Sequence, residues 1–91
     1  MRLDLFLKSS RLCPRRTIAQ KLCDAGLVRV GDRKAKPAQA VHPGDEITIL
    51  RANRVTTIRV KEVPVSRQTS RKEAGSLFEV LHDEVLERDG L

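Results

Sequence analysis

Residues 14–26 read Pro-Arg-Arg-Thr-Ile-Ala-Gln-Lys-Leu-Cys-Asp-Ala-Gly, and this stretch decides the fold of the N-terminal half. Proline suits the first position of a helix because its φ is already helical and its missing N–H would be unbonded there. Glycine suits the residue just beyond a helix C-terminus. The apolar residues recur at helical spacing and share one face: Ile18, Ala19, Leu22 and Cys23. The stretch therefore predicts a helix from Pro14 to about Asp24.

Two adjacent arginines, Arg15 and Arg16, fall in the first turn of this predicted helix. Cations at the positive end of the helix dipole cost up to about 1 kcal/mol at a surface, and Asp or Glu is the usual choice there. The pair is either a solvated face or a grip for phosphate, which helix N-termini bind. We favour the phosphate grip. On this view, replacing both arginines with alanine weakens binding and leaves thermal stability equal or slightly higher.

Periodicity outward from this helix predicts a small sheet. Residues 3–9 carry apolar side chains at i, i+3 and i+4 and form a short first helix. Residues 27–30, 46–50 and 55–63 read as strands, and residues 33–42 as a polar, irregular excursion. Turns are expected at Gly31-Asp32 and at Pro43-Gly44-Asp45, with proline at i+1 and glycine at i+2 of the second turn.

The C-terminal third is less regular. Residues 64–76 are polar and read as a linker. Residues 77–81 read as a last strand, with a helix as the alternative because Ser76 and Glu79 have capping-box spacing. The chain is accordingly divided into one α+β domain over residues 1–63, a polar linker over residues 64–76, and a C-terminal strand with a frayed acidic tail over residues 77–91. The fold class is α+β, with two N-terminal helices packed on a small, mostly antiparallel sheet.

Charge is concentrated at one end of the chain. The 91 residues carry a net charge of +6, and residues 1–36 alone hold ten Lys or Arg against three Asp, a net charge of +7. A localised basic surface favours a polyanion partner, with nucleic acid ahead of an anionic membrane. Only two phenylalanines and no Trp or Tyr are present, which argues against sequence reading by base stacking.

Compartment and cofactor signals are few. No apolar run approaches a membrane span, and the N-terminus lacks a signal-peptide core, so we expect a cytoplasmic protein. Cys13 and Cys23 match no zinc spacing and are expected to be free thiols, Cys23 on a buried helix face. His42 and His82 are far apart in sequence and suggest no metal site.

Five short motifs occur in a fixed order. They are Arg2-Leu3-Asp4 with Leu7, Ser10-Arg11, Arg15-Arg16-Thr17 with Ala19, Gly26-x-Val28-x-Val30, and Val41-x-Pro43-Gly44-Asp45-x-Ile47. At this spacing they resemble the S4-type RNA-binding domain, and the resemblance covers residues 2–50. The Arg2-Leu3-Asp4 opening, the Arg15 triplet and Leu77-Phe78-Glu79-Val80-Leu81 are similar to the RqcP-type proteins of bacterial ribosome-associated quality control, which are related to the heat-shock S4 proteins.

The resemblance implies an RNA-binding protein that is not an enzyme, needs no cofactor and acts as a monomer. Its partners would be rRNA of the large ribosomal subunit, peptidyl-tRNA and an RqcH-type factor, and it would support alanine tailing of stalled nascent chains. The alternatives are a heat-shock-type protein that recycles large subunits carrying peptidyl-tRNA, a ribosome-assembly module, and an RNA-modifying enzyme with a catalytic partner.

The resemblance also places the RNA-binding face on the two helices and the hairpin that follows. Carried over by position, that face consists of Arg2, Lys8, Arg11, Arg15, Arg16, Lys21, Arg33, Lys34 and Lys36. Arginine binds phosphate in a planar, bidentate manner, and lysine acts as a point charge. Asp4 is expected to be a structural helix-start carboxylate, with Arg2 or Arg11 as a possible ion-pair partner.

Overall fold

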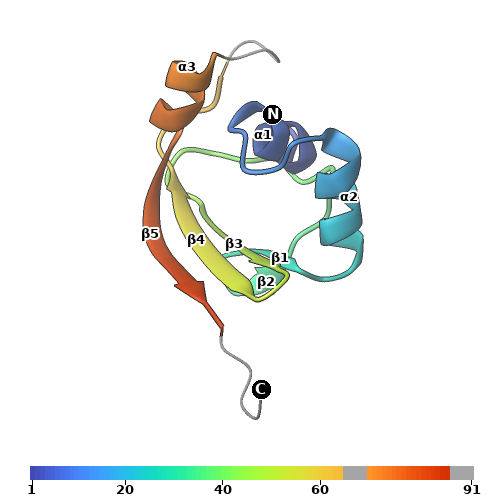
Figure 1. Cartoon of the computed structure of the whole chain (residues 1–91). Helices are drawn as coiled ribbons and strands as arrows, with labels where there is room; N and C mark the ends of the chain where they lie inside the picture. Colours follow the sequence, from blue (N-terminus) through green and yellow to red (C-terminus); the bar gives the residue numbers. More distant parts are fainter. Residues whose placement is uncertain (65–69, 87–91) are drawn as a thin grey trace.

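Two helices lie inside the curve of a five-stranded sheet in the computed structural model, which describes residues 1–64 and 70–86 (Figure 1). The helices are α1 (Leu3–Ser9) and α2 (Arg16–Asp24). The strands are β1 (Val28–Val30), β2 (Arg33–Lys34), β3 (Glu46–Arg51), β4 (Arg54–Val60) and β5 (Phe78–Val85), and helix α3 (Arg71–Ser76) precedes β5. Their order in the sheet is β2-β1-β3-β4-β5, with every neighbouring pair antiparallel. The predicted α+β class is confirmed.

The core lies between the two helices and the inner face of the sheet. Leu3, Phe6 and Leu7 of α1 are fully buried, as their i, i+3, i+4 spacing predicts. Alternate residues of the central strands face them, and Ile47 of β3 lies directly opposite Ile58 of β4. Cys13 and Cys23 are both buried free thiols, which confirms that prediction.

Helix α2 begins later than the sequence predicts. Arg15 is its N-cap, with an extended backbone (φ −141°, ψ 148°), and Arg16 is its first helical residue. Pro14 is therefore outside the helix. The cause lies in Cys13, which is fully buried and donates its N–H to the carbonyl of Leu7 at 3.0 Å. This contact holds the connecting segment against α1, so helical geometry starts only after it.

Two predicted chain reversals are confirmed. At the end of α2, Gly26 has a φ of +76°, and its N–H and that of Leu27 donate to the carbonyls of Cys23 and Leu22. These two hydrogen bonds form the Schellman motif that ends the helix. In the Pro43-Gly44-Asp45 turn, Gly44 has a φ of +94° and the N–H of Asp45 donates to the carbonyl of His42 at 3.1 Å, as a type II turn requires.

Several sequence-based boundaries are wrong in detail. The excursion over residues 33–42 begins with β2, which pairs with β1. β4 runs over Arg54–Val60 instead of residues 55–63, because Val60 is the last residue that pairs with β5, opposite Phe78. The predicted linker over residues 64–76 contains α3, whose N-cap Ser70 accepts the N–H of Glu73 at 3.1 Å.

The last segment is a strand, as favoured over the helix alternative. β5 extends to Val85, well into the predicted frayed tail, because residues 82–85 pair with residues 54–57 of β4. The rest of the predicted acidic tail, residues 87–91, lies outside the described residues. Across residues 1–64 and 70–86, none of the helices is both long and apolar enough to cross a membrane.

Candidate nucleic-acid interface

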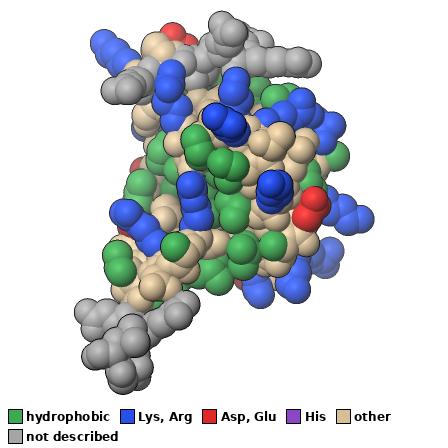
Figure 2. Space-filling view, turned by 45° about the vertical axis from the view of Figure 1, so that its right-hand side comes forward, with side chains coloured by type: hydrophobic (Ala, Val, Ile, Leu, Met, Phe, Trp, Pro, Cys, Tyr) green, Lys and Arg blue, Asp and Glu red, His purple; other side chains and the backbone are tan. Residues whose placement is uncertain are grey.

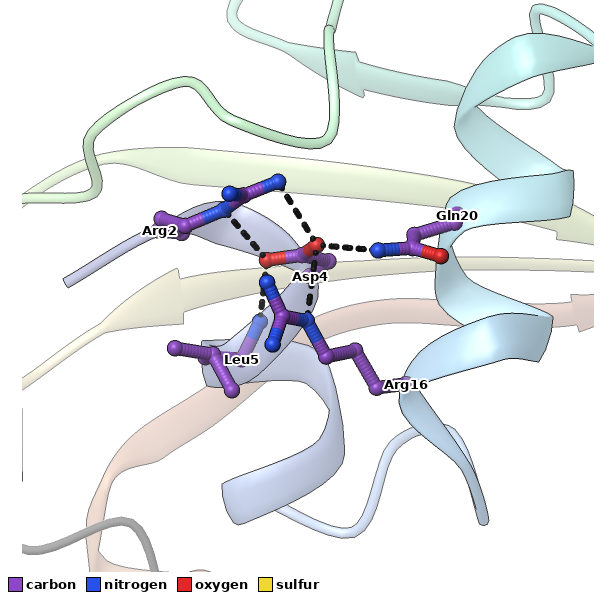
Figure 3. Close-up of polar contacts among 5 residues, drawn as sticks. All are labelled: Arg2, Asp4, Leu5, Arg16 and Gln20. Atoms are coloured by element: carbon purple, nitrogen blue, oxygen red, sulfur yellow. Dashed lines mark hydrogen bonds and ion pairs between the residues drawn. The ribbon is translucent and has the colours of Figure 1, made fainter.

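A buried carboxylate organises the start of both N-terminal helices. Asp4 lies in the first turn of α1, and its side chain has no solvent exposure. Arg2 donates from Nε to Oδ1 at 3.2 Å and from Nη2 to Oδ2 at 3.1 Å. Arg16 Nε and Gln20 Nε2, both from α2, donate to Oδ2 at 3.1 and 2.9 Å (Figure 3). The N–H of Leu5 donates to Oδ1 at 2.8 Å, so both carboxylate oxygens are saturated. We call Arg2, Asp4, Arg16 and Gln20 the Asp4 cluster.

These bonds control the ionisation of Asp4. Burial by itself raises the pKa of the carboxyl, but the hydrogen bonds from Gln20, Arg16 and the Leu5 backbone, with the charge of Arg16, outweigh it. The pKa of Asp4 is therefore held below its ordinary value, and the group is ionised at neutral pH. A buried charge of this kind is tolerated only when it is paired and hydrogen-bonded.

The lowered pKa of Asp4 predicts a pH-dependent contribution to stability. The unfolded chain titrates near 3.8 and the folded chain lower, so the contribution is complete above 3.8 and is lost as pH falls through the folded pKa. We expect the difference in melting temperature between wild type and Asp4→Asn to be constant from pH 7 to 5 and to shrink below pH 4. Thermal unfolding followed by circular dichroism across this range measures it. A difference that stays constant down to pH 2 would contradict the assignment.

The Asp4 cluster leaves part of two arginines facing solvent. The side chains of Arg2 and Arg16 are 44% and 37% exposed. Arg16 bonds Asp4 through Nε, and its two terminal nitrogens carry four further N–H donors. A guanidinium fixed on one edge and exposed on the other is positioned to receive an external anion without losing further side-chain freedom.

The N-terminus of α2 has the features of an anion site, with one correction. Its first turn holds no acidic residue, and no side chain caps it. The exposed Arg15 stands at its N-cap. However, Arg16 is not an uncompensated cation, because Asp4 pairs with it. The expectation that losing both arginines leaves stability equal or slightly higher is thus wrong in its premise for Arg16. For Arg15 it stays a prediction.

Comparisons with known proteins identify the family of this chain. Residues 1–47 match the S4 domain family. The chain belongs to the S4 domain family. It is 38% identical over 86 residues to the RQC P-site tRNA stabilizing factor of Bacillus subtilis, covering 94% of this chain and 98% of that protein. It is 39% identical over 89 residues to the factor of the same name from Halalkalibacterium halodurans, covering 97% and 98%.

Solved structures agree in fold. Trimeric heat shock protein 15 of Vibrio cholerae superposes with a TM-score of 0.80 at 28% identity, covering 88% of this chain and 80% of that one. The solution structure of hypothetical protein HP1423 superposes with a TM-score of 0.78 at 27% identity, covering 92% and 100%. The predicted S4 membership and the resemblance to the ribosome-associated quality-control branch are both confirmed.

The remaining predicted binding residues spread around the S4 domain. Lys8 and Lys21 are exposed in the last turns of α1 and α2, where a cation also stabilises the helix end. Arg11 is exposed in the loop between the helices. The exposed residues on the β2 side of the domain are Arg33, Lys34 and Lys36. Figure 2 shows a face where Lys and Arg side chains surround a central apolar area and acidic side chains are few.

One of these residues has a structural contact as well. A Cβ placed on Gly26 would lie 3.4 Å from the Nζ of Lys34, so this ammonium packs against the C-terminal end of α2. There its positive charge interacts favourably with the negative end of the helix dipole. Of the nine predicted residues, Arg2 and Arg16 thus bond Asp4, and Lys34 lies near the C-terminal end of α2.

Sequence reasoning missed three side chains near this surface. Gln20 lies one turn after Arg16 on α2, so the i, i+4 spacing was the available signal for a shared face. Arg51 and Arg54 flank the hairpin turn between β3 and β4 and lie opposite each other. No group of three or more His, Cys, Asp or Glu within residues 1–64 and 70–86 is arranged to hold a metal ion.

Proposed function

We propose that this S4-domain protein binds structured RNA of the large ribosomal subunit when that subunit is obstructed by peptidyl-tRNA. The partners are rRNA and the tRNA, with an RqcH-type factor on the same particle, in the cytoplasm. The observation that best supports this proposal is the Asp4 cluster beside the exposed Arg15. The cluster presents fixed guanidinium groups at the uncapped N-terminus of α2. The relatives named RQC P-site tRNA stabilizing factor support this choice of RNA.

In this proposal the protein contributes binding and positioning, and no bond is made or broken. Arg2, Arg15 and Arg16 contact phosphates at one end of the domain, and Lys8, Arg11, Lys21, Arg33, Lys34 and Lys36 extend the contact. Such backbone contacts fix register and orientation without reading sequence. A tRNA held in this way would remain in place while the RqcH-type factor delivers alanyl-tRNA for tailing. The protein acts as a monomer.

A second candidate is recycling of large subunits that carry peptidyl-tRNA. It is favoured by the likeness to heat shock protein 15 over 88% of this chain. The two candidates predict different products. Tailing lengthens the nascent chain with alanine when the RqcH-type factor is added, whereas recycling yields a free large subunit without alanine addition.

The test uses purified large subunits with and without peptidyl-tRNA. Co-sedimentation is expected for wild type on the obstructed subunits, and Arg15→Glu is expected to abolish it, because a charge reversal places an anion against phosphate. The matched control is Lys61→Glu, also a charge reversal, at an exposed residue that directly follows β4 and lies outside the predicted face. It should sediment like wild type. Equal loss in both variants would mean that only net charge matters, and preference for vacant subunits would overturn the proposal.

A further inference from the structure

The helical layer leaves one end of the inner sheet face uncovered. A hollow of about 500 Å³ lies there, between the α1–α2 loop and the ends of β3, β4 and β5. This is a volume in the range of small-ligand sites. Its floor is apolar, formed by Ile49, Phe78 and Val80, with Leu12 from the loop beside them. Val80 remains 53% exposed although it pairs with the buried Ile58, whereas Phe78 is half-buried and Ile49 is buried. The part of this floor that the described residues leave uncovered is therefore centred on Val80.

The rim of the hollow is basic. Arg11, Arg51 and Arg54 line it, against the single carboxylate of Asp83. Arg51 is held by a 2.9 Å bond from Nη1 to the carbonyl of Leu12, and Arg54 donates from Nε to Asp83 at 2.6 Å. The rim therefore carries a net charge of about +2 next to an apolar floor, which suits a ligand that is flat and apolar on one side and anionic on the other.

Backbone strain is concentrated at the same place. Among the described residues, the non-glycine residues with positive φ are Arg11 (63°) and Ala52 (50°), and both line the hollow. Such a conformation costs of order 1–2 kcal/mol for a residue with a Cβ and tends to occur where a ligand is clamped. The α1–α2 loop and the β3–β4 turn thus each place one strained residue at the same hollow.

We propose that the hollow binds one unpaired nucleotide of RNA. The base lies on Phe78 and Val80, and its phosphate bonds Arg11 and Arg51. This rests on the proposed RNA-binding function and adds a ligand subsite to it. A nucleotide is favoured over an acidic peptide because guanidinium groups bind phosphate and stack on bases, and because Arg11 belongs to the loop that leads directly to Arg15. A floor of one aromatic and several aliphatic side chains accepts any base, so the subsite recognises an extruded nucleotide without reading its identity.

The first experiment uses the unaltered chain and adenosine 5′-monophosphate. In a methyl NMR titration we expect saturable shifts at Leu12, Ile49 and Val80 with a millimolar dissociation constant. Adenosine and inorganic phosphate alone should each give weaker shifts. Absence of shifts at these methyls, or equal shifts with phosphate alone, overturns the proposal. It is also overturned if a Glu- and Leu-containing peptide shifts them and the nucleotide does not.

The second experiment compares Val80→Glu with Leu81→Glu. Both add one negative charge to an exposed residue of β5, but only Val80 lines the hollow. For an RNA hairpin with one bulged nucleotide, Val80→Glu should lower affinity about 5–10-fold, as expected from losing one base contact. Leu81→Glu should lower this affinity less than about 2-fold. For a hairpin without the bulge, the two variants should have equal affinities. Equal losses for the bulged hairpin overturn the proposal.

These readouts separate the two proposals. If the nucleotide fails to bind while wild type still co-sediments with obstructed subunits, only the hollow is refuted. If the nucleotide binds but the chain ignores obstructed subunits, the proposed function fails and the subsite remains a nucleotide site.

Discussion

Asp4→Asn is expected to destabilise the protein by about 2–3 kcal/mol. Removing one member of a buried ion pair costs about 3–5 kcal/mol, and the lower figure applies because Arg2 and Arg16 are partly hydrated. In a domain of this size that corresponds to a fall in melting temperature of about 10–20 °C. RNA affinity should fall at least about tenfold, 1.4 kcal/mol, because neither guanidinium is then held in place. Calorimetry and fluorescence anisotropy with a ribosomal RNA hairpin measure the two effects.

Asp24→Asn is the matched control for this change. Asp24 ends α2, is exposed and lies outside the Asp4 cluster. Its replacement should change stability by less than about 0.5 kcal/mol, with a slight gain because an acidic residue opposes the dipole at a helix C-terminus. A melting temperature for Asp4→Asn as close to wild type as that of the control would contradict the role assigned to Asp4.

Arg15→Ala and Arg16→Ala are expected to separate binding from stability. Arg16→Ala removes the Nε bond to Asp4, a charge-assisted hydrogen bond worth about 1.5 kcal/mol, and should lower the melting temperature by about 5–10 °C. Arg15→Ala removes no described bond and should leave the melting temperature within about 3 °C. Both should weaken RNA binding, and each should flatten the slope of log K against log salt by about 0.7–0.9 per lost phosphate contact.

Arg16→Lys sharpens this test. Lysine retains the charge but lacks the planar fork that bonds Asp4 and an external phosphate at once. We expect part of the stability to return while RNA binding stays weak. If Arg16→Lys restored binding fully, charge alone would explain the role of Arg16. If Arg15→Ala melted as early as Arg16→Ala, Arg15 would be a structural residue.

Local sequence signals predicted local structure well. The apolar spacing of Leu3, Phe6 and Leu7 gave the bounds of α1, and Pro43-Gly44-Asp45 gave a turn with the expected positive φ at Gly44. Helix α3 was missed because its six residues include one buried apolar side chain, Ala74, and so carry no apolar periodicity; its cap at Ser70 was the signal available.

The features that depend on how distant segments meet were harder to predict. The late start of α2 follows from burial of Cys13 against α1, which no local pattern shows. An ion pair of Asp4 with Arg2 or Arg11 was an alternative to RNA binding for those two arginines, and the structure shows it for Arg2. Arg16 and Gln20 reach the same carboxylate only through the way α1 and α2 pack, so their part in the Asp4 cluster could not be read from spacing alone.

The shared carboxylate also restricts which substitutions this chain can accept. A neutral residue at position 4 strands the charges of Arg2 and Arg16, and an apolar residue at position 16 or 20 leaves part of a buried anion without a donor. Each single substitution is therefore expected to lower the stability of the fold. Substitutions at positions 2, 4, 16 and 20 are coupled, and a chain that replaced all four with well-packed apolar residues would keep its shape while losing its fixed cations.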